Sequence, residues 1–140
     1  MSAPAEVLRL GAIARLDPEP ERTLATWRAD LDRGVLDDPA ETRRRLDEYE
    51  QGDAAVVELG LFADVLDGGE LRRVDGLHVG GLWFERGEDV QNERHAAETV
   101  SDRIEAIRDD LERHGVPAAA AQLARLPIKI ELDPELARTL

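Results

Sequence analysis

Two histidines and a glutamate are the residues whose types and spacing could support metal chemistry. His95 and Glu98 are three residues apart, which places them on one face of a helix, as in the Glu and His pairs of carboxylate-bridged metal bundles. A third ligand could come from His78 or Asp75, which lie upstream in sequence. One interpretation is therefore a metal-binding protein or metal-dependent enzyme that uses His78, His95 and Glu98. It requires that His78 and His95 converge in the fold.

Other kinds of catalytic chemistry have little support in the residues. The chain has no cysteine, and its only serines are Ser2 and Ser101. Ser101 lacks the glycine-flanked turn of a hydrolase nucleophile. Gly80 and Gly81 do not form part of a phosphate-binding motif, and no lysine follows them closely. We predict no catalytic residue and no cofactor. The residues favour a non-enzymatic protein over an enzyme but leave the question open.

The net charge of −13, with 35% charged residues, limits the classes of partner. Such a negative field repels phosphate backbones and anionic lipids, so we expect neither nucleic acid nor a membrane as partner. It increases the rate of encounter with a basic protein; solubility in a salt-rich cytosol is the alternative explanation. The first residues lack the features of a signal peptide, and no stretch approaches 18 apolar residues, which predicts a cytoplasmic protein.

Turn and capping residues predict a single α+β domain in which helices predominate, over residues 1–140. Helices are expected at about 17–34 and 38–52, and a central buried helix over Asp53–Asp67 because that segment is apolar on nearly every side. A β-hairpin is expected at about 70–85, turning at Asp75-Gly76. A short C-terminal strand is expected at about 128–132, where Ile128, Ile130 and Leu132 alternate with polar residues.

A long amphipathic helix over about 90–114 gives the clearest periodic signal. Apolar residues recur at alternating spacings of three and four and form one narrow seam: Ala97, Val100, Ile104, Ile107 and Leu111. Such a seam can pack on the chain's own core or against a second copy in a homodimer, and the sequence leaves both open. The opposite side carries His95 and four acidic residues: Glu98, Asp102, Glu105 and Asp109.

Three helices, a hairpin and a long helix resemble, in their order alone, the layout of a winged-helix regulator with a dimerisation helix. In that layout Asp53–Asp67 would be the helix that enters the major groove of DNA. This segment has four acidic residues and no basic one, whereas base and phosphate contacts need basic or amide side chains. The chemistry therefore argues against DNA binding.

Trp83 is the most useful candidate contact residue. Alternation in a strand sends Trp83 to the face opposite Leu82 and Phe84, so one face becomes core and the other a contact surface. With the acidic residues Glu98, Asp102, Glu105 and Asp109 it would form an interaction surface. The sequence thus favours a small non-catalytic interaction or regulatory protein, of an accessory, inhibitor or immunity type, that binds a protein partner, most readily a basic one.

Overall fold

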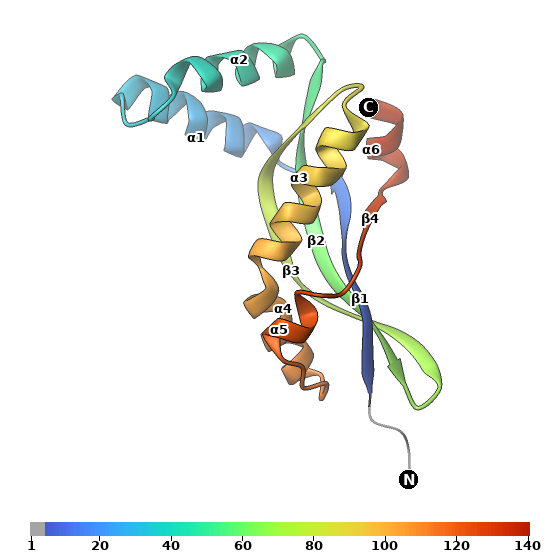
Figure 1. Ribbon diagram of the computed structural model, residues 1–140. Helices are drawn as coiled ribbons and strands as arrows, with labels where there is room; N and C mark the ends of the chain where they lie inside the picture. Colours follow the sequence, from blue (N-terminus) through green and yellow to red (C-terminus); the bar gives the residue numbers. More distant parts are fainter. Residues whose placement is uncertain (1–4) are drawn as a thin grey trace.

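A four-stranded mixed sheet with helices on both sides forms the molecule, and the α+β class expected from the sequence is confirmed. The computed structural model describes residues 5–140. The strands lie in the order β3-β2-β1-β4, antiparallel except for the parallel pair β1 and β4 (Figure 1). The elements in chain order are β1 (Glu6–Leu16), α1 (Pro20–Arg33), α2 (Pro39–Glu50), β2 (Ala54–Asp67), β3 (Glu70–Glu85), α3 (Asp89–Asp102), α4 (Ile104–Arg113), α5 (Ala120–Leu123), β4 (Ile128–Leu132) and α6 (Pro134–Thr139).

The prediction of a central helix over Asp53–Asp67 is wrong, because this segment forms the central strand β2. Almost every residue of β2 is buried on one face of the sheet or the other. A strand covered on both faces is as continuously apolar as a buried helix, so periodicity could not separate the two. The winged-helix layout is lost with this helix.

The prediction of a hairpin within residues 70–85 is wrong, because the hairpin is formed by β2 and β3 and turns earlier in the chain. Residues 70–85 form the single strand β3, which pairs with β2 through a turn at Gly68 and Gly69, where φ is 62° and 86°. Gly76 lacks the positive φ that a tight Asp-Gly turn requires. The long neighbouring strand β2 offers pairing along the whole of β3, and two register shifts absorb the irregular residues.

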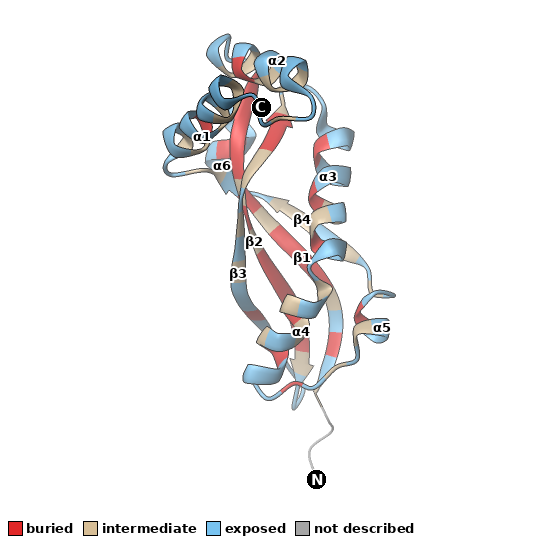
Figure 2. Cartoon of the chain, turned by 90° about the vertical axis from the view of Figure 1, so that its left-hand side faces the viewer, coloured by how far each residue is buried: buried red, intermediate tan, exposed pale blue. Residues whose placement is uncertain are grey.

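The helix expected over 90–114 is divided into α3 and α4 at Arg103, whose φ and ψ are −114° and 20°. Both helices pack on one face of the sheet. Val100, Ile107 and Leu111 are buried in the main core with β1 and β2, and Ile104 packs against it (Figure 2). The predicted seam is therefore core within one chain, although Ala96 takes the fully buried place expected for the half-buried Ala97.

Helices α1 and α2 form an antiparallel pair that projects past one end of the sheet (Figure 1). Their apolar faces close a second, smaller core made of Leu24, Leu46, Ala54, Val56 and Trp83. Asp38 caps α2, accepting a hydrogen bond from the Glu41 amide at 3.1 Å, as its sequence predicts. This second core lies on the sheet face opposite α3 and α4, at the end where β2 begins.

Two further strands complete the sheet. The predicted C-terminal strand is confirmed as β4, Ile128–Leu132, and β1 lies between it and β2. The sequence had not indicated β1. Within residues 5–140, no helix has both the length and the apolar character needed to cross a membrane.

Candidate interaction surface

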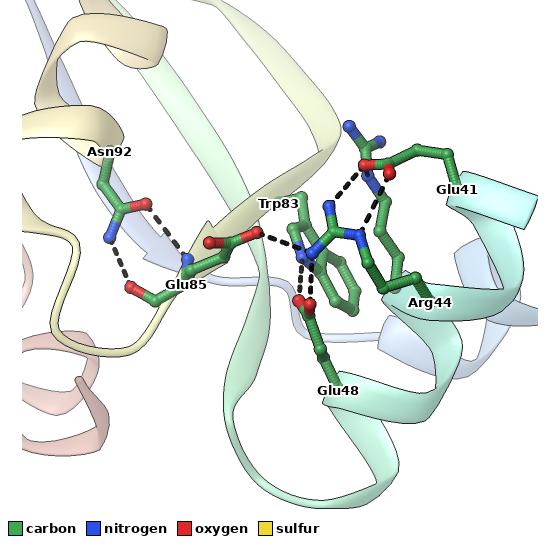
Figure 3. Close-up of polar contacts among 7 residues, drawn as sticks. Glu41, Arg44, Glu48, Trp83, Glu85 and Asn92 are labelled. Atoms are coloured by element: carbon green, nitrogen blue, oxygen red, sulfur yellow. Dashed lines mark hydrogen bonds and ion pairs between the residues drawn. The ribbon is translucent and has the colours of Figure 1, made fainter.

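The junction between β3 and α3 is held by a single buried amide. Asn92, which is 6% exposed, accepts a hydrogen bond from the Glu85 amide at 3.0 Å and donates one to the Glu85 carbonyl at 2.8 Å. The side chain thus pairs with the last residue of β3 as a neighbouring strand would (Figure 3). This contact fixes where α3 begins, and therefore where the side chains of its first turns lie.

A polar groove of about 370 Å³ lies between α2 and α3, over the end of β3. We call it the helix groove. Its lining is mostly charged and comes from α2, β3, α3 and the connection between β3 and α3: Glu41, Arg44, Arg45, Trp83, Glu85, Glu88, Gln91, Asn92 and His95.

Arg44 is the centre of the ion pairs in the helix groove. Its guanidinium contacts the carboxylates of Glu41, Glu48 and Glu85 (Figure 3), and Arg45 also pairs with Glu41. The hydrogen bond from Arg44 holds the pKa of Glu41 below its usual value of 4.5. The pairs within α2 join residues three or four positions apart, the spacing at which side chains of one helix face meet.

The ionic contacts of the groove leave it with an excess of negative charge. Because Arg44 already serves three carboxylates, its donors are largely used. Glu88 forms no ion pair within residues 5–140, and the lining has three glutamates against two arginines. Such a lining favours a cationic group over an anionic one.

Trp83 lies beneath this groove rather than on the surface. Alternation does place it opposite Phe84, as expected, but its face of the sheet is covered by α1 and α2, and Trp83 is only 7% exposed. Its ring packs 5.5 Å from that of Trp27, centroid to centroid, and its indole nitrogen donates to Glu48 at 3.4 Å. The expectation of an exposed aromatic is therefore wrong.

The four acidic residues expected on the long helix do lie on its exposed side. Glu105 and Asp109 share Arg108, at 2.8 and 3.8 Å. Glu98 and Asp102 form no ion pair with any residue of the described chain. Together with Glu88, the exposed residue that precedes α3, these residues make up what we call the acidic stripe: Glu88, Glu98, Asp102, Glu105 and Asp109. His95 lies on the same side of α3 as Glu98 and connects the stripe to the helix groove.

The structure does not bring His78, His95 and Glu98 together. His78 lies on the sheet face away from α3, where its Nδ1 is 3.2 Å from Glu58 and from Arg15. His95 lines the helix groove beside α2. Among residues 5–140, no three His, Asp or Glu side chains are grouped so as to hold a metal ion. The convergence that the metal interpretation requires is absent.

The sheet face opposite α3 and α4 carries a charged network that the sequence analysis missed. We call its uncovered middle part the open face (Figure 2). Asp64, only 6% exposed, binds Arg9 and Arg73, and Arg73 continues to Glu131 at 2.7 Å. Arg73 also lies 3.6 Å above the Phe62 ring. In the sequence, the one signal for this network is Asp64, a single carboxylate within an apolar stretch. A carboxylate in such a stretch needs charged or hydrogen-bonding partners when it is buried.

Comparison with known proteins gives no relative from which a role could be transferred: no family model, no curated protein and no solved structure matches the chain. The functional argument rests on the chain's own residues.

Proposed function

We propose that this protein is a small, non-catalytic interaction protein that binds a basic region of a protein partner along the acidic stripe and the adjoining helix groove. The observation that carries the proposal is the set of exposed carboxylates just before α3 and along α3 and α4, of which Glu88, Glu98 and Asp102 form no ion pair within the described chain. The net charge of −13 adds a long-range attraction for a basic protein.

The rigidity of the surface supports the proposal. The stripe lies on helices whose other side is locked into the core by Val100, Ile107 and Leu111, and Asn92 holds the start of α3 to β3. Because the backbone that carries these carboxylates is already ordered, little backbone conformational freedom is lost on binding.

A monomer is the form that binds in this proposal. The seam that could have joined two copies is buried against the sheet, and an excess of like charge opposes self-association. Light scattering is expected to return the mass of one chain, 15.5 kDa. A protein concentration of tens of micromolar would populate a dimer with a dissociation constant of about 1 μM. A mass of two chains would contradict this part of the proposal.

Affinity capture from native lysate tests the binding surface. The variant Glu98→Gln/Asp102→Asn removes two unpaired charges from the stripe and is expected to lose the partner that the unsubstituted protein retains at low salt and releases at high salt. The matched control is Asp32→Asn/Asp37→Asn, which removes the same charge from exposed positions in the last turn of α1 and in the connection to α2. Equal retention by both variants would refute the proposed surface.

A further inference from the structure

The edge of the sheet at β4 offers unpaired main-chain groups. Within residues 5–140, β4 pairs with β1 alone. The Pro127 carbonyl accepts from Leu10 at 3.1 Å, and the Asp133 amide donates to Ala14 at 2.8 Å. Because strand residues alternate in the direction of their main-chain groups, those of Ile128, Ile130 and Leu132 point away from β1, toward the open edge.

An apolar pocket of about 110 Å³ lies directly beside this edge. We call it the edge pocket. Its apolar walls come from β3, β4 and the C-terminal residue: Phe84, Ile130, Leu132 and Leu140. Leu132 is 47% exposed. Apolar cavities of roughly 150 Å³ accept a benzene ring, so the edge pocket suits one aliphatic side chain.

The rim of the edge pocket is acidic. Asp89 and Glu93, one turn apart on α3, line it together with Asn92. Both carboxylates are exposed, and neither forms an ion pair within residues 5–140. The pocket therefore combines an apolar floor with two carboxylates that form no ion pair in the described chain.

We propose that an extended segment of the basic partner pairs with the open edge of β4, inserting one aliphatic side chain into the edge pocket and placing basic side chains two residues away against Asp89 and Glu93. This inference rests on the proposed function and adds the mode of recognition. Main-chain hydrogen bonds supply affinity in such strand addition, and the pocket with its rim supplies specificity.

Other occupants and edges fit less well. A second copy pairing edge to edge would bring Asp89 and Glu93 of one chain toward the same acidic surface of the other. The opposite edge, β3, is interrupted by two register shifts. Arg72 of β3 is also held to the His114 carbonyl at 3.1 Å.

Peptides that alternate like a strand test the mode of recognition. The probe is the heptapeptide Thr-Arg-Thr-Leu-Thr-Arg-Thr, which presents Leu and two Arg on one face. NMR titration with the full chain is expected to slow hydrogen exchange of the Ile130 and Leu132 amides. A peptide methylated on the edge-facing nitrogens, and a second peptide with Glu in place of Arg, are each expected to bind at least about tenfold more weakly.

Protein variants identify the pocket and rim. Leu132→Arg and Asp89→Asn/Glu93→Gln are each expected to weaken binding of the heptapeptide about tenfold. The control Asp32→Asn/Asp37→Asn, with the same loss of charge at exposed positions away from the pocket, leaves this short peptide bound. Failure of the peptide to bind, equal binding of the methylated peptide, or shifts confined to the acidic stripe would each overturn the inference. A partner captured from lysate through Glu98 and Asp102 but unaffected by Leu132→Arg would refute this inference and leave the proposed function standing.

Discussion

Asp64 is the charged residue on which the open face depends. Burial by itself raises the pKa of this carboxyl, but hydrogen bonds from Arg73 and Arg9, together with their positive charges, outweigh it and hold the pKa below its usual 3.8. Arg73 holds the pKa of Glu131 below its usual value as well. A carboxyl with a lowered pKa in the folded state stabilises the fold above its unfolded pKa and loses that contribution as the pH falls.

Replacing Asp64 should expose both its energetic and its pH-dependent contribution. Asp64→Asn is expected to lower the free energy of unfolding by about 1–3 kcal/mol near neutral pH, because Arg9 and Arg73 lose a charged acceptor at a buried site. Asp64 contributes its full stabilisation above its unfolded pKa of about 3.9 and loses it progressively as the pH falls below that value. The variant should therefore lose less stability on acidification to about pH 3 than the unsubstituted protein does. Urea unfolding at the two pH values measures both effects.

Asp75→Asn is the control for that experiment. Asp75 of β3 lies on the same face of the sheet as Asp64 of β2, is exposed and forms no ion pair in the described chain. Its replacement should therefore change the free energy of unfolding by less than about 0.5 kcal/mol. An Asp64→Asn protein as stable as this control, or with an unchanged response to acid, would contradict the assigned contribution.

Asn92 is the second residue with a large expected effect. Asn92→Ala leaves the Glu85 amide and carbonyl without their side-chain partners and is expected to cost about 1–3 kcal/mol in denaturant unfolding. Gln91→Ala, one position earlier and exposed, provides the comparison and should be nearly neutral. Equal stability of the two variants would mean that the β3–α3 junction is held by other contacts.

At the scale of elements, the packing of β1 against β2 depends on a glycine. Gly11 of β1 pairs with Phe62 of β2, and a Cβ atom at Gly11 would collide with the Phe62 ring and with the Lys129 carbonyl of β4. The absent side chain lets the ring lie across β1 and lets β4 approach. The close packing of β1, β2 and β4 at this point therefore requires a glycine at position 11.

Gly11→Ala is expected to lower the free energy of unfolding by about 1–3 kcal/mol, because the overpacked strands must shift. Gly80→Ala is the matched control on an outer strand, since a Cβ there meets no atom within 4 Å and the residue has no positive φ. Denaturant unfolding of both proteins gives the comparison. Similar values for the two variants would show that β1 and β2 can relax around the added methyl group.

The elements also show where local sequence signals succeed. The start of α2, the seam of α3 and α4, and β4 were predicted correctly, because Asp38, Val100, Ile107 and the alternation after Pro127 act through neighbours a few residues away. The secondary structure of residues 53–67 was not predicted correctly. Its almost uniform burial is caused by helices and strands from distant parts of the chain, which cover both of its faces. Nor did local signals indicate β1, whose pairing partners come from residues 57–66 and 128–132.

The whole molecule carries far more negative than positive charge, and this should govern its response to salt. Stability is expected to rise as sodium chloride increases from about 0.1 to 1 M, because the screening length falls from about 10 to 3 Å and self-repulsion weakens. Thermal unfolding midpoints across this range measure the effect, and choline chloride separates screening from effects of a particular cation. A falling midpoint would mean that the ion pairs, such as those of Arg44 and Arg73, outweigh the repulsion.

The sequence by itself determined the charge, the α+β class, the amphipathic surface of α3 and α4 and the strand β4, since each follows from composition or from residues near one another in the chain. Only the tertiary structure decided that Trp83 is covered, that His78 and His95 lie apart, and that Asn92 joins β3 to α3. These outcomes depend on which face of the sheet each helix covers. That choice is made by contacts between residues far apart in sequence, and no spacing within one segment records it.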